Sequence, residues 1–154
     1  MRYIGSKLNL LPQLDAAVIE RQPKGGTFCD IFSGTGAVGR YFKNRFPVVS
    51  NDLLYFSHVL QYAGIQLNQE PNFDLLEKEV GDPFHYLNTI NIEKFNFMSS
   101  PFVANSFSPY QSGERMYLTE KNALTIDAIR QSIQEWLDTN LITKDGYMYL
   151  LASL

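Results

Sequence analysis

Apolar residues in the first part of the chain alternate between helical and strand-like spacing. Leu11, Leu14 and Val18 lie three or four positions apart, which is the spacing of one face of a helix. Short β-rich runs and further helical patterns follow in turn. The predicted helices cover residues 9–22, 37–46 and 55–67, and the predicted strands cover 27–32 and 48–52. A strand, a helix and a second strand in this order begin a βαβ unit with a parallel sheet.

The pattern is weaker in the second part of the chain. A short helix is predicted over 73–80, whereas residues 81–118 have no steady period and are rich in Phe, Asn, Ser and Pro. We interpret 81–118 as an insertion in the core fold. A long helix is predicted to begin at Thr119 and to end at Asn140. The last apolar segment, 147–154, has no stop signal, so we expect the sequence to break off within an element.

Composition restricts the class of protein. The length of 154 residues predicts one domain, and a composition of 45% apolar and 19% charged residues is that of a soluble globular protein. The longest stretch without charge, 95–113, contains polar residues and two prolines, which excludes a membrane span. Cys29 is the single cysteine and there is no Cys/His cluster, so we expect a cytoplasmic protein without a metal site. The net charge of −3 argues against coating nucleic acid by bulk charge, but it leaves room for a local basic face.

A glycine-rich turn at residues 33–36 is the strongest candidate for a ligand site. Gly34 and Gly36 lie between a predicted strand and a predicted helix, where backbone N–H groups can approach a ligand. No Gly-Lys-Ser/Thr follows, which excludes a P-loop. Asp52 ends the next strand, where a carboxylate can accept from both hydroxyls of a ribose. With Gly39 these residues also fit a dinucleotide-dependent oxidoreductase, or a tight turn with a capping aspartate.

Longer stretches around these residues resemble the Dam-like (alpha-class) N6-adenine DNA methyltransferases. Residues 30–39 resemble the S-adenosylmethionine motif of that family, 2–7 its N-terminal motif and 50–53 its acidic ribose motif. The resemblance is weaker over 70–105 and continues through 108–154. It argues against an oxidoreductase, in which such an N-terminal motif has no role. The resemblance implies an α/β, Rossmann-like S-adenosylmethionine-dependent methyltransferase fold, truncated and with an inserted helical segment.

The resemblance also implies how the chain is divided and which residues bind ligands. Residues 1–80 would form the S-adenosylmethionine-binding core, 81–118 an insertion that is a candidate DNA-recognition segment, and 119–154 a helical segment that is incomplete at its C-terminus. The implied cofactor-binding residues are Tyr3, Lys7, Asp30, Phe32, Ser33, Gly34, Gly36, Asp52 and Leu53. The candidates for contacts to double-stranded DNA are Tyr110, Arg115 and Tyr117. Tyr3 could equally fill the core, Lys7 could be a solvated lysine, and the DNA candidates could form an exposed loop anchored by aromatic rings.

One motif of the family is missing from the chain. Its catalytic signature, Asp/Asn-Pro-Pro-Tyr/Phe, holds the N6 amine of a flipped adenine in line with the methyl group. Residues 81–84 contain one proline, and the Ser-Pro pairs at 100–101 and 108–109 start with serine. We therefore assign no catalytic residue and expect this chain alone to be inactive.

These observations lead to one predicted function and one alternative. The prediction is the cofactor-binding part of a site-specific adenine-N6 DNA methyltransferase, from a restriction–modification system or an orphan modification gene. A missing C-terminal polypeptide would carry the catalytic motif. The alternative is a non-catalytic remnant that binds S-adenosylmethionine or DNA, or a subunit of a split methyltransferase.

Overall fold

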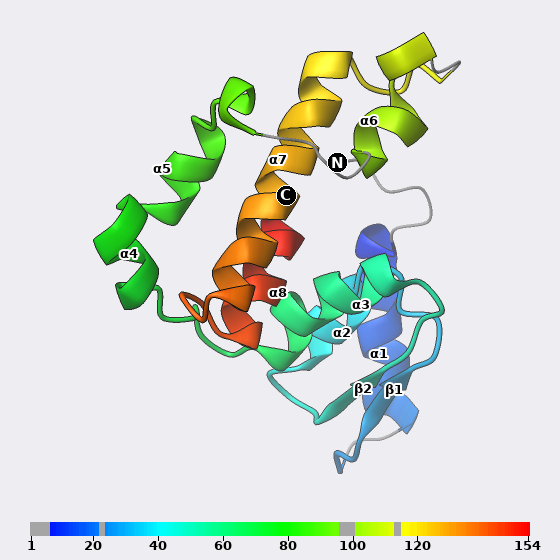
Figure 1. Cartoon of the computed structure of the whole chain (residues 1–154). Coiled ribbons are helices and arrows are strands. Elements are labelled where there is room, and N and C mark those ends of the chain that lie inside the picture. The colour runs from blue at the N-terminus through cyan, green and yellow to red at the C-terminus, as the bar shows by residue number, and fades with distance from the viewer. Residues whose placement is uncertain (1–6, 22–23, 96–100, 113–114) are drawn as a thin grey trace. The chain divides into compact units, whose positions relative to one another are not determined.

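The computed structural model describes residues 7–21, 24–95, 101–112 and 115–154 (Figure 1). Two compact units form, residues 1–70 and residues 71–154, where the length of the chain predicted one domain. No helix in the described ranges is long and apolar enough to cross a membrane.

The first unit contains a two-stranded sheet and the helices that pack on it. Its elements are η1 (Leu8–Leu10), α1 (Leu11–Arg21), β1 (Phe28–Asp30), α2 (Ala37–Phe42), β2 (Val48–Ser50), α3 (Tyr55–Gln61) and the π-helix η2 (Tyr62–Gln66). The strands are parallel, and Phe28 pairs with Val48 and Asp30 with Ser50. The predicted strand–helix–strand order is confirmed, with strands shorter than predicted. The carboxyl ends of both strands therefore lie at the same edge of the sheet.

Aromatic rings form the core beneath this sheet. Phe42 is fully buried, and its ring stacks on Phe28 of β1 with centroids 4.3 Å apart. Phe46 packs against the same ring at 5.9 Å. The Arg45 guanidinium lies 5.1 Å from the centre of the Phe42 ring and pairs with Asp15, so it ties α1 to the end of α2.

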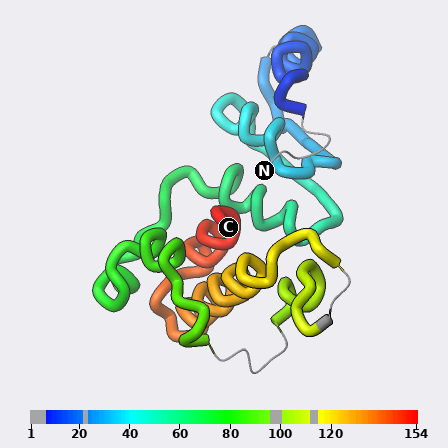
Figure 2. The backbone as a smooth tube through the Cα atoms, turned by 90° about the horizontal axis from the view of Figure 1, so that it is seen from above, coloured from blue at the N-terminus to red at the C-terminus, as the bar shows by residue number. Residues whose placement is uncertain are grey.

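The second unit is helical within its described ranges. Its elements are α4 (Asp74–Val80), α5 (Pro83–Asn88), η3 (Ile92–Lys94), α6 (Phe102–Phe107), η4 (Tyr110–Ser112), α7 (Glu120–Asp138) and α8 (Lys144–Ser153). Helices α6 and α8 both lie beside α7 (Figures 1 and 2). The core residues are Phe73, Leu76, Leu87, Ile133, Trp136, Ile142 and Leu150. The predicted long helix is confirmed, with Thr119 as its N-cap and Asn140 at a positive φ of 59° just beyond its end.

Some predicted elements differ from the structure. Residues 81–118 have no steady period from which a particular element could be predicted, although the resemblance implies a helical insertion. They contain the helix α5, for which the Asp82 side chain is the N-cap and Pro83 the first residue. The apolar segment 147–154 belongs to α8, which begins earlier because Thr143 caps it. Helix α4 packs in the second unit through Leu76. The division of the chain by function at residues 80 and 118 stays a prediction.

Candidate cofactor site

The glycine-rich turn is joined to the end of β2 by backbone hydrogen bonds. Asn51 N donates to Asp30 O (2.8 Å), and Ser33 N donates to Asn51 O (3.0 Å). The Ser33 hydroxyl lies 2.7 Å from the same Asn51 oxygen and 3.0 Å from Asp30 O. Ser33 is therefore buried, and its side chain supports the turn from within.

The carboxylate of Asp52 closes this arrangement. Its Oδ2 accepts from Gly34 N (2.8 Å) and its Oδ1 from Leu54 N (3.1 Å). These two N–H groups, Leu54 first, hold the pKa of Asp52 below the ordinary value for an aspartate. The buried Ser57 hydroxyl faces the same carboxylate and also lowers its pKa, although its geometry falls short of a hydrogen bond. Asp52 is consequently ionised at neutral pH and links the turn after β1 to the segment after β2.

Both glycines of the turn adopt a backbone conformation that other residues rarely take. Gly34 has a φ of 51° and Gly36 a φ of 75°, both in the left-handed region. A Cβ on Gly36 would lie 3.1 Å from Gln61 Cγ and 3.2 Å from Ile65 Cδ1, so a side chain there would require both neighbours to shift. Gly36 N donates to Ser33 O (2.8 Å), which closes the turn directly before α2.

The remaining predicted cofactor residues fall into two groups. Asp30 is half-buried and its Oδ1 accepts from Phe32 N at 3.4 Å, whereas the side chains of Phe32 and Leu53 are 77% and 97% exposed beside the turn. Lys7 is exposed, and its carbonyl accepts from Leu10 N at the start of η1. Tyr3 lies outside the described residues. The role of the N-terminal motif stays a prediction.

One side chain at the turn was missed by the analysis of the sequence. Gln61 is 6% exposed, and its Nε2 donates to Gly34 O at 3.1 Å. The available signal was spacing, because Ser57 and Gln61 are polar residues four positions apart on one buried face of α3.

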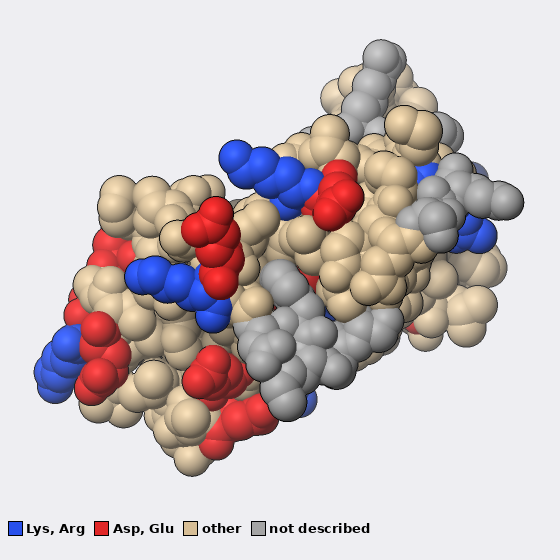
Figure 3. Space-filling view, turned by 45° about the horizontal axis from the view of Figure 1, so that its top comes forward, with Lys and Arg blue, Asp and Glu red and all other residues tan. Residues whose placement is uncertain are grey.

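The DNA-binding candidates lie in the second unit. Tyr110 begins η4, Arg115 is exposed, and the 77% exposed ring of Tyr117 lies 6.4 Å from that of Phe107 on α6. On the face seen in Figure 3, several basic side chains of the described residues lie beside acidic ones. Contact of these residues with DNA stays a prediction.

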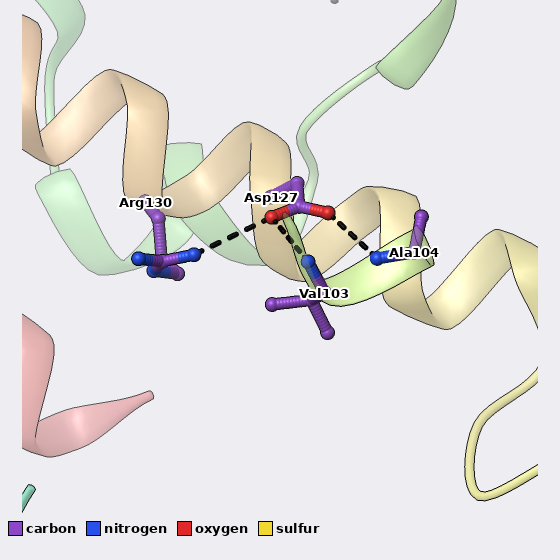
Figure 4. A network of polar contacts seen from close by, with 4 residues as sticks. All are labelled: Val103, Ala104, Asp127 and Arg130. Carbon is purple, nitrogen blue, oxygen red and sulfur yellow. Dashed lines mark hydrogen bonds and ion pairs between the residues drawn. The ribbon is translucent and has the colours of Figure 1, made fainter. Parts of the chain in front are cut away.

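Helix α6, which precedes these candidates, is attached to α7 by one carboxylate. Asp127 is 7% exposed, and its Oδ1 accepts from Val103 N (3.0 Å) and its Oδ2 from Ala104 N (2.9 Å). Arg130 Nη1 lies 3.5 Å from Oδ1 (Figure 4). A residue of α7 therefore supplies the acceptors for the first turn of α6.

The two partial matches to the catalytic signature that the structure describes have structural roles. Asp82 Oδ1 accepts from Phe84 N (2.8 Å) and His85 N (3.0 Å) at the start of α5. Ser108 is fully buried, and its hydroxyl donates to Ala104 O at 2.7 Å. Among the described residues, no group of His, Cys, Asp and Glu side chains could hold a metal ion.

Comparison with known proteins gives one family over almost the whole chain. Residues 3–154 match the profile of the D12 class N6 adenine-specific DNA methyltransferases. Modification methylase LlaI of Lactococcus lactis subsp. lactis is 43% identical over 155 residues, which are 100% of this chain and 24% of that protein. The type II methyltransferase M.FokI of Planomicrobium okeanokoites is 43% identical over 156 residues, which are 100% and 24% of the two chains. For M.NlaIII of Neisseria lactamica the identity is 34%, over 100% of this chain and 44% of the relative.

The matched relatives are much longer than this sequence. The chain spans about a quarter of the length of LlaI and M.FokI. No solved structure gives a significant match.

Proposed function

Since this chain belongs to the D12 class of N6 adenine-specific DNA methyltransferases, we propose that it forms the S-adenosylmethionine-binding part of an enzyme that methylates adenine N6 at a specific site in double-stranded DNA. In this proposal residues 1–80 hold the cofactor within a Rossmann-like fold, residues 81–118 form the DNA-recognition insertion, and residues 119–154 support it. The Asp/Asn-Pro-Pro-aromatic signature would come from a further polypeptide segment.

The hydrogen bond between Gly34 and Asp52 is the observation that carries the proposal. It fixes an ionised carboxylate against a turn whose glycines leave the backbone open. A carboxylate offers about four acceptor positions, and the backbone bonds to Gly34 and Leu54 use two of them. The others can accept from two vicinal hydroxyls, so the residues fit a ribose. The exposed side chains of Phe32 and Leu53 offer apolar surface for the base.

The residues of this chain bind and orient, and they do not transfer protons. When bound, S-adenosylmethionine would supply a methyl group on a positively charged sulfonium, which is already an activated leaving group. Orienting the adenine amine needs acceptors that the sequence does not provide, because Asp82 and Ser108 are bonded within the fold. We therefore expect binding without turnover by the chain alone. The alternative, a non-catalytic subunit, leads to the same expectation of binding by this chain.

The first expected result is that the purified chain binds S-adenosylhomocysteine and not NAD. Asp52 and the glycine turn alone would fit either ligand. Membership of the methyltransferase family favours S-adenosylhomocysteine. Isothermal titration of each ligand into the 154-residue chain measures the two affinities. Tighter binding of NAD, or no binding of either ligand, would contradict the proposal.

The second expected result concerns Asp52→Ala. Removing a charged acceptor from bound hydroxyls should weaken the affinity for S-adenosylhomocysteine about 10- to 150-fold. Glu20→Ala, which removes an exposed carboxylate of α1, is the control for the change in net charge. Unchanged affinity of a folded Asp52→Ala variant would mean that the carboxylate only caps the end of β2.

A further inference from the structure

The side-chain amide of Gln61 is a buried polar group whose contacts lie in the candidate site. Gln61 ends α3, and the chain continues directly into the π-helix Tyr62–Gln66. Its side chain is 6% exposed, and its Nε2 donates to Gly34 O at 3.1 Å. A buried amide without a partner costs free energy, so this hydrogen bond holds the side chain in one orientation.

Gly34 is consequently held on both sides. Its N–H donates to Asp52 Oδ2 at 2.8 Å, and its carbonyl accepts from Gln61. The peptide group between Gly34 and Thr35 is planar and trans, so its carbonyl and its N–H point in opposite directions. Since the Gly34 oxygen faces Gln61, the N–H of Thr35 points away from α3. That N–H has no acceptor in the part of the chain that the structure describes.

Gln61 is also packed against the turn. Its Cγ would lie only 3.1 Å from a Cβ on Gly36, so the aliphatic part of the side chain covers the second glycine of the turn. The π-helix that follows is held by Lys43, whose Nζ donates to Leu67 O (2.7 Å) and Gly64 O (3.2 Å). π-Helical turns of this kind are frequent at functional sites.

We propose that Gln61 is a positioning residue of the cofactor site: by holding the Gly34 carbonyl, it fixes the direction in which the N–H of Thr35 is presented to the bound ligand as a hydrogen-bond donor. This inference rests on the proposed function. It adds to that function a residue that does not touch the ligand and a backbone donor that does.

Two substitutions separate positioning from packing. Gln61→Met keeps the length of the side chain and removes the donor, and we expect the affinity for S-adenosylhomocysteine to fall about 2- to 12-fold. Gln61→Glu keeps the shape, but its ionised carboxylate repels the Gly34 carbonyl. When this carboxyl is protonated, its O–H can donate in place of the amide. Burial raises the pKa of such a glutamate, so the protonated form is accessible near pH 5.5.

The experiment is titration of S-adenosylhomocysteine into the full chain at pH 8 and at pH 5.5. The quantity compared is the ratio of each variant's dissociation constant to that of the original chain at the same pH. For Gln61→Glu we expect this ratio to be about 10 or larger at pH 8 and to fall close to one at pH 5.5. The control is Gln66→Glu, which adds the same charge at an exposed position of the π-helix after Gln61 and should give a ratio near one at both pH values.

A second measurement needs no variant. In nitrogen-15 spectra of the original chain, the Thr35 N–H resonance should shift when S-adenosylhomocysteine binds. Absence of that shift would overturn the proposal, as would a Gln61→Glu ratio that is the same at both pH values or a Gln61→Met affinity equal to the original. If the original chain itself fails to bind, the proposed function fails first, and the two results are distinguishable.

Discussion

Phe42→Ala is expected to destabilise the first unit by about 3–5 kcal/mol, which is the range for removing a fully buried aromatic ring. Phe42 is 0% exposed and is the last residue of α2, with its ring against β1. Its loss leaves a cavity beside Phe28, whose ring it stacks on at 4.3 Å, and removes the ring over which Arg45 lies. A two-stranded sheet has little other apolar contact to replace these.

The measurement is hydrogen exchange of the amides of β1 and β2, followed by mass spectrometry. Exchange in these peptides should become faster, because their protection depends on the free energy of opening. Phe32→Ala is the matched control, since it removes the same side chain from a position that is 77% exposed. It should change stability by no more than about 0.5 kcal/mol. Equal effects of the two substitutions would contradict the assignment of Phe42 as the core of this unit.

The sequence was sufficient for the parts of the site that depend on local order along the chain. Gly34 and Asp52 were assigned to one ligand site because each follows a strand of the predicted βαβ unit. The structure places them together, and a 2.8 Å hydrogen bond that was not predicted joins them. Thr119 and Asn140 were predicted as helix ends because their side chains and backbone preferences act locally. Whether these residues bind a cofactor is left to the titrations.

The sequence was insufficient where a side chain finds its partner far along the chain. Gln61 was not identified from the sequence, because it donates to a carbonyl 27 residues before it and no local pattern predicts that acceptor. Asp82 was compared with a catalytic signature, although Asp followed by Pro is also the local signal for the start of a helix such as α5. The helical character of 119–154 was predicted, but the start of α8 was not, because the apolar segment 147–154 does not include the cap at Thr143.

Asp127→Ala is expected to destabilise the second unit by about 3 kcal/mol. Two backbone N–H groups in the first turn of α6, those of Val103 and Ala104, would lose a charged acceptor inside the protein, and each such loss costs about 1–3 kcal/mol. The Arg130 side chain is 45% exposed, so water can solvate its charge and it adds little to the loss. The substitution therefore acts mainly by detaching α6 from α7.

Urea unfolding followed by the fluorescence of Trp136 measures this effect, because Trp136 is the single tryptophan and lies in the core of the second unit. The matched control is Asp138→Ala on the same helix, which removes an exposed carboxylate that accepts from Gln134 Nε2 at 2.8 Å. Its effect should stay within about 0.5 kcal/mol. If Asp127→Ala changes stability no more than Asp138→Ala does, then α6 is held to α7 by apolar packing alone. In that case the segment bearing Tyr110 and Tyr117 would keep its position without the carboxylate.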